Sequence, residues 1–80
     1  MKIKNMANEN ENYAKLAQKI KLMRKEKGYS QTKFSIMLGI SREHLAKLET
    51  AKRCPSIGLL FDMAKLLNVE TKDFFDFKNI

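Results

Sequence analysis

The feature of this sequence that most constrains its fold is the segment 30–53, which reads SQTKFSIMLGISREHLAKLETAKR. Its apolar residues recur every three or four positions on either side of Gly39, which predicts two short one-sided helices. Gly39 is predicted to end the first helix, because glycine readily adopts the left-handed conformation found at many helix ends. Ser30 and Ser41 precede the two helices and are typical helix caps. The apolar residues that we expect to share one core are Phe34, Leu38, Ile40, Leu45 and Leu48.

Two short helices joined by a glycine turn form a helix-turn-helix, whose second helix commonly enters the major groove of DNA. The charge distribution agrees with such a polyanionic partner. Residues 1–53 carry 13 Lys and Arg against 5 Asp and Glu, whereas residues 54–80 carry 3 against 4. This asymmetry favours one basic surface for a polyanion. Charge alone fits a generally soluble basic surface equally well.

The rest of the chain is predicted to be all-α, because Gly and Pro are few and no strand-like alternation occurs. Its length of 80 residues allows one domain with a core of modest size. We expect a flexible polar arm over residues 1–11, a DNA-binding domain over 12–77 and a C-terminal tail over 78–80. Helices besides those of the helix-turn-helix are predicted at residues 13–26, 57–67 and 71–75, the first capped by Asn12 and the second by Ser56.

Several classes of function are disfavoured by the sequence. With one His, one Cys, no HExxH or CxxC motif and no glycine-rich phosphate loop, we expect no enzyme, no cofactor and no metal site. A single cysteine, Cys54, excludes an internal disulfide framework and fits a cytoplasmic protein. No apolar run approaches the roughly 18 residues of a membrane span, and the first residues lack the apolar centre of a secretory signal. A redox role for Cys54, beside the charge of Arg53, is an alternative to an ordinary loop thiol.

The order and spacing of these elements resemble the Xre family of lambda-repressor-like DNA-binding proteins, which includes phage repressors. The likeness covers residues 16–75 and rests on the stretches MRKEKGYSQTKFSIMLGISREHLAKLE, KRCPS and MAKLLNVETKDFF. The positions that agree are Arg24, Gln31, Gly39, Ser41, Glu49, Pro55 and the closing Phe75.

This resemblance implies a compact five-helix domain in which helices two and three form the helix-turn-helix. It also implies that Arg24 and Glu49 form a buried pair between helix one and the end of helix three. The chain departs from the family pattern at Ala51 and Asn68, where the family usually has glycine. Ala51 therefore leaves the shape of the turn after helix three open.

The second helix of the helix-turn-helix carries the predicted base-reading residues. Stepping 100° per residue from Arg42 turns Glu43, Ala46 and Lys47 outward, with Arg42 and His44 beside them. Arg42 suits guanine, Lys47 suits a base or a phosphate, and Glu43 suits the amino group of cytosine. The family resemblance places base reading on the same three residues, and we add His44. The alternative for Glu43 and Lys47 is a simple pair on a solvated helix face.

Phosphate contacts are predicted near the helix starts and after the second helix. The first turn of a helix offers unpaired N–H groups and the positive end of the helix dipole, both of which attract a phosphate. Such contacts position a protein on DNA without distinguishing sequences. The residues predicted to make them are Gln31, Lys33, Ser41, Lys52 and Arg53. For Ser41 we expect helix capping to be the first role and a DNA contact the second.

The sequence therefore predicts a sequence-specific regulator of transcription that binds double-stranded DNA, most simply a repressor. One helix touches few base pairs, so we expect a homodimer on a palindromic operator. The expected dimer surface joins the start of the fourth helix to the apolar tail formed by Phe74, Phe75, Phe77 and Ile80. One of Phe74 and Phe75 must close the core. The alternative is an antitoxin-like module whose main partner is another protein.

Overall fold

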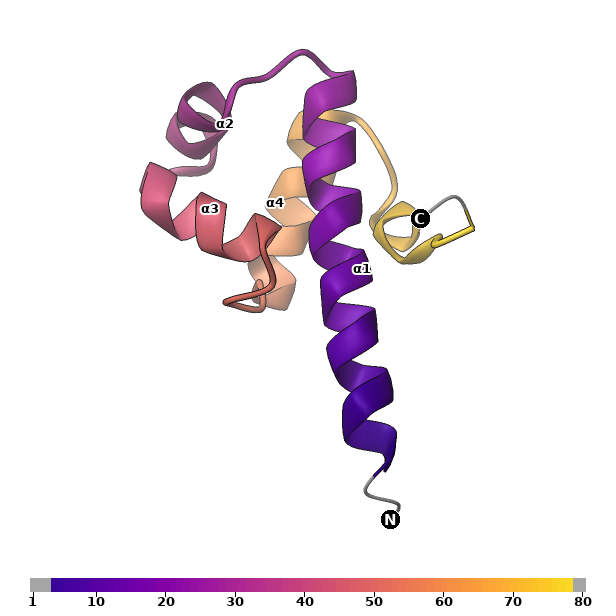
Figure 1. Cartoon of the computed structure of the whole chain (residues 1–80). Coiled ribbons are helices and arrows are strands. Elements are labelled where there is room, and N and C mark those ends of the chain that lie inside the picture. The colour runs from indigo at the N-terminus through magenta and orange to yellow at the C-terminus, as the bar shows by residue number, and fades with distance from the viewer. Residues whose placement is uncertain (1–3, 79–80) are drawn as a thin grey trace.

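The computed structural model describes residues 4–78, with the side chains of residues 11–78. The described chain is all-helical, and its elements are α1 (Lys4–Glu26), α2 (Gln31–Leu38), α3 (Arg42–Glu49), α4 (Ile57–Leu67) and the 3-10 helix η1 (Thr71–Phe75). The helices α2 and α3 lie on one side of the long α1, and η1 lies on the other (Figure 1). The all-α class and the helix-turn-helix are confirmed. The expected fifth α-helix is instead a 3-10 helix, a form that proteins use in short pieces.

Helix α1 begins at Lys4, well before the expected start at residue 13, and its first turns extend beyond the other elements (Figure 1). The segment 4–12 contains neither Gly nor Pro. Because each residue added to an existing helix gains a backbone hydrogen bond, the packed half of α1 can propagate through this polar stretch. A boundary at residue 12 between arm and domain stays a prediction.

No helix in the described part of the chain combines the length and hydropathy needed to cross a membrane.

The predicted ends of α2, α3 and α4 are confirmed, whereas the predicted cap at Asn12 is wrong, because Asn12 lies inside α1. The side-chain oxygens of Ser30, Ser41 and Ser56 each accept a hydrogen bond from the backbone N–H three residues later, at 3.0, 2.9 and 3.1 Å. Each bond satisfies an N–H that has no partner within its own helix. Gly39 ends α2 at a φ of +75°, and Asn68 ends α4 at a φ of +57°. Local residue chemistry therefore fixes where α2, α3 and α4 begin and where two of them end.

Every element contributes to one core. Of the five apolar residues expected from the helix-turn-helix, three are fully buried, while Leu38 and Ile40 pack at its edge. The buried cluster consists of Leu16, Ile20, Met23, Phe34, Leu45, Leu48, Leu60, Met63, Ala64, Leu67 and Phe74.

The core is closed by Phe74, whereas the family resemblance pointed to Phe75. Phe74 is fully buried and Phe75 is 49% exposed. Successive residues of a helix point about 100–120° apart, so only one of these neighbours can face the core. Phe74 therefore cannot serve the dimer surface, and its assignment to that surface is wrong.

The turn after α3 has a left-handed residue at Ala51, with a φ of +63°. The carbonyl oxygen of Lys47 accepts hydrogen bonds from the N–H groups of Lys52 and Arg53, at 2.9 and 3.2 Å. These bonds fold the two basic residues back onto the end of α3. The turn therefore adopts a left-handed conformation that glycine takes up more readily, at the cost of a strained alanine.

Replacing Ala51 with glycine is expected to stabilise the protein. A left-handed residue with a Cβ costs about 1–2 kcal/mol, while glycine lowers stability by about 0.4–1 kcal/mol through the unfolded chain. We expect Ala51→Gly to raise the free energy of unfolding by about 0.5–1 kcal/mol, measured by urea denaturation. Ala14→Gly, at an exposed site in α1, is the control and should lower it by a similar amount. Equal losses in both variants would contradict the strain at Ala51.

Candidate nucleic-acid interface

The two faces of α3 differ sharply in burial. Its inner face consists of Leu45, Leu48 and Glu49, all buried, as the helical wheel predicted. On the outer face Arg42 and Glu43 are exposed, and His44, Ala46 and Lys47 are half-buried. All four predicted base-reading side chains thus lie on the part of α3 that the core leaves uncovered. Their roles in base reading stay predictions.

Glu43 and Lys47 lie four residues apart on this outer face. In the described range of residues the structure contains one ion pair, and it joins Arg24 to Glu49. Glu43 and Lys47 therefore do not pair with each other, and the interpretation of these residues as a simple solvated pair is wrong. The outer face presents a carboxylate and two basic groups that form no ion pair with one another.

The predicted buried pair between Arg24 and Glu49 is confirmed. The Nε of Arg24 donates to Oε2 of Glu49 at 2.6 Å, and its Nη2 donates to Oε1 at 3.0 Å. The third nitrogen, Nη1, donates to the carbonyl oxygen of Tyr29 at 2.7 Å. A guanidinium matches a carboxylate in this two-bonded geometry, which lets both charges remain buried. The pair joins α1, the loop after it and the last residue of α3.

Gln31 donates a third hydrogen bond to the same carboxylate. Its Nε2 donates to Oε1 of Glu49 at 2.9 Å, which places the start of α2 beside the end of α3. Sequence reasoning missed this bond, although a carboxylate accepts more hydrogen bonds than one arginine supplies. One hydrogen of the Gln31 side-chain amide is therefore occupied by Glu49. A phosphate contact by Gln31 depends on its backbone N–H in the first turn of α2 and on the other hydrogen of that side-chain amide.

The other predicted phosphate-binding residues occupy both ends of the helix-turn-helix. Lys33 lies in the first turn of α2, with its ammonium 5.5 Å from the centre of the Tyr29 ring. Lys52 and Arg53 are exposed directly after α3. The hydroxyl oxygen of Ser41 already accepts the cap bond, so capping is its first role as predicted. Their contacts with phosphate stay predictions.

An apolar groove of about 390 Å³ lies between α1, the start of α4 and the end of the chain. The most exposed apolar side chains of its lining are Ile57, Phe75 and Tyr13, at 64%, 49% and 47%. Two of the predicted dimer residues, Phe75 and Phe77, line this groove, together with the start of α4. Sequence reasoning missed Tyr13, and Ile80 lies outside the described residues. The groove is lined by Asn12, Tyr13, Leu16, Cys54, Pro55, Ile57, Leu60, Phe75 and Phe77.

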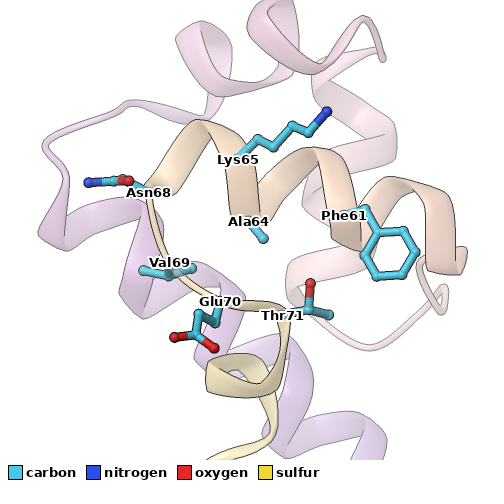
Figure 2. A pocket seen from close by; sticks show the side chains of 7 residues that line it. All are labelled: Phe61, Ala64, Lys65, Asn68, Val69, Glu70 and Thr71. Carbon is cyan, nitrogen blue, oxygen red and sulfur yellow. The ribbon is translucent and has the colours of Figure 1, made fainter.

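A larger and more open hollow, of about 560 Å³, lies at the end of α4 (Figure 2). Phe61 and Thr71 lie at one end of it, and its lining comes from α4 and the segment leading into η1. No residue of α2 or α3 among those described lines it, so it is separate from the helix-turn-helix. Its lining consists of Phe61, Ala64, Lys65, Asn68, Val69, Glu70 and Thr71.

Breaking the buried pair is expected to be costly. Arg24→Met should lower the free energy of unfolding by about 3–5 kcal/mol, because Glu49 would remain buried without its main partner. The double variant Arg24→Met/Glu49→Leu should lose less free energy of unfolding than Arg24→Met and Glu49→Leu lose together, since no buried charge remains. Urea denaturation of the two single variants and the double variant measures these losses. Lys25→Met, at the exposed neighbouring position, should change stability by less than about 0.5 kcal/mol. Additive losses would contradict the coupling.

A family model described as helix-turn-helix matches residues 20–74. The chain is 38% identical over 55 residues to the uncharacterized HTH-type transcriptional regulator YazB of Bacillus subtilis (strain 168), covering 69% of this chain and 80% of YazB. It is 36% identical over 58 residues to the HTH-type transcriptional regulator SlrR of the same organism, covering 71% of this chain but only 38% of SlrR.

Two solved structures share the fold. The restriction-modification controller protein C.AhdI from Aeromonas hydrophila superposes with a TM-score of 0.75 at 25% identity, covering 79% of this chain and 96% of C.AhdI. An HTH_3 family transcriptional regulator from Vibrio cholerae superposes with a TM-score of 0.74 at 26% identity, covering 82% of this chain and 37% of that protein. The matched residues include all of α2, Gly39 and α3. The chain therefore belongs to the helix-turn-helix family of DNA-binding transcriptional regulators.

Proposed function

We propose that this protein is a cytoplasmic repressor of transcription that binds a palindromic DNA operator as a homodimer and reads the major groove with α3. The observation that carries the proposal is the uncovered face of α3. That face presents Arg42 and Glu43 exposed and unpaired with each other, at the end of the helix that enters a groove first. Regulators are also the class named for YazB, SlrR and the Vibrio cholerae structure, and C.AhdI is named a controller protein.

The roles of individual residues follow from their chemistry. Arg42 presents a planar fork to guanine, Lys47 donates to a base or a phosphate, Glu43 accepts from cytosine, and His44 flanks them. An antitoxin-like protein-interaction module would favour an apolar strip on this face of α3, whereas the strip here is charged. Positioning on the DNA backbone falls to residues at the start of α2 and on either side of α3, namely Gln31, Lys33, Ser41, Lys52 and Arg53.

The homodimer is supported by the apolar groove. Ile57, Phe75 and Tyr13 each expose about half or more of their side chains around it. The rings of Phe75 and Phe77 lie 6.5 Å apart, so they form one aromatic edge. A contiguous apolar surface of this kind commonly marks a protein interface, and a second copy supplies the same surface by two-fold symmetry.

Two substitutions test whether Arg42 contacts bases and Lys33 contacts the DNA backbone. On an operator selected from random duplex DNA, Arg42→Ala is expected to cost about 1–3 kcal/mol and to relax selectivity at one or two base pairs. Lys33→Ala should weaken all sequences equally and reduce the salt dependence, since each neutralised phosphate contributes a slope of about 0.9 in log affinity against log salt. Fluorescence anisotropy at several salt concentrations measures both effects.

Lys65→Ala is the matched control, because Lys65 is an exposed lysine on α4 that lines the separate hollow. It should leave affinity and selectivity unchanged. Equal, sequence-independent losses in the Arg42 and Lys33 variants would contradict their different roles. Failure of the protein to bind duplex DNA at low salt would contradict the proposed function itself.

The dimer is tested by two phenylalanines of matched exposure. Phe75→Ser is expected to shift the monomer–dimer equilibrium at least about tenfold towards monomer, because it removes a half-exposed aromatic anchor from the groove. Phe61→Ser is the control, since Phe61 is 51% exposed but lines the other hollow. Analytical ultracentrifugation over a concentration series measures both, with circular dichroism to confirm the fold. A strictly monomeric wild-type protein would contradict the dimer.

A further inference from the structure

Tyr29, in the loop between α1 and α2, is fixed on two sides. Its ring stacks on the fully buried Phe34, with ring centres 5.9 Å apart and an angle of 17° between the planes. Its carbonyl oxygen accepts the hydrogen bond from Nη1 of Arg24 at 2.7 Å. A stacked ring on a tethered backbone is a rigid platform, although Tyr29 itself is only partly buried.

The ammonium of Lys33 lies over this platform, 5.5 Å from the ring centre. An aromatic face attracts a cation at this range through the negative charge density of its π system. Lys33 is otherwise an exposed side chain with several freely rotating bonds, so the ring restricts where its charge resides. In the described part of the chain no carboxylate forms an ion pair with Lys33.

We propose that Tyr29 is a positioning residue for DNA binding, which holds the ammonium of Lys33 ready for a phosphate of the DNA backbone. This inference depends on the proposed function. A ring attracts the ammonium without neutralising it, whereas a carboxylate would compete with the phosphate. The backbone N–H groups of Gln31 and Thr32 belong to the same first turn, where intrahelical acceptors are lacking. Lysine and backbone donors can therefore meet one phosphate together.

The same platform is tied to the reading helix. Arg24 donates to the Tyr29 carbonyl and also to both carboxylate oxygens of Glu49, the last residue of α3. The position of the Lys33 charge is thereby linked to α3 through three successive contacts. Such a link fixes the phosphate contact relative to the bases that α3 reaches, which is what a positioning contact must do.

A double-mutant cycle on a short random-sequence duplex at low salt tests the inference. Tyr29→Phe keeps the ring and should bind within about twofold of the wild type. Tyr29→Leu removes the ring's attraction and should bind about two- to fivefold more weakly, the range expected for an exposed cation–π contact. In a Lys33→Met background, Tyr29→Leu should have no further effect, because the residue through which it acts is gone.

An equal loss from Tyr29→Leu in both backgrounds would overturn the inference, because the ring would then act through packing alone. That result leaves the proposed function intact, since the wild type would still bind. Absence of wild-type binding would overturn both. A second measurement needs no variant: the side-chain CH₂ protons of Lys33 should show upfield ring-current shifts by NMR, in the free protein and in the DNA complex. Random-coil shifts in the complex would also overturn the inference.

Discussion

The interaction on which the rest of the structure depends is the buried pair between Arg24 and Glu49. Charged groups are costly to bury unless every hydrogen-bonding site has a partner, and here Glu49 accepts from Arg24 and Gln31 while Arg24 also binds the Tyr29 carbonyl. These bonds are directional, so they hold α1, the start of α2 and the end of α3 in one arrangement. Apolar contacts alone would tolerate small rotations of these helices.

Much of the fold could be predicted because it depends on residues close together in the sequence. A serine caps the N–H three positions later, Gly39 and Asn68 accept the left-handed conformation, and apolar residues every three or four positions face one side. The inward direction of Glu49 follows from the same helical geometry. These features gave the helix-turn-helix, its core face and the uncovered face of α3.

The features that were missed depend on packing between distant elements. Phe74 and Phe75 are adjacent and chemically identical, so only the docking of η1 on α1 and α4 decides which of them enters the core. The Gln31 bond to Glu49 spans 18 residues, and Tyr29 contacts both Arg24 and Phe34 from the loop between α1 and α2. No local pattern distinguishes these outcomes. Helix α1 begins at Lys4 and not at residue 13, because a polar segment without Gly or Pro can extend an existing helix.

The residues that fold α3 and hold it on the domain lie on its inner face and at its ends, apart from the residues of its outer face. A helix of eight residues is too short to be stable alone, so α3 depends on the Ser41 cap, on Leu45 and Leu48 in the core, and on Glu49 in the buried network. Arg42, Glu43 and Lys47 take no part in any of these contacts. Under the proposed function, substitutions at the three outer positions therefore change which bases the helix meets while leaving its position on the domain unaltered.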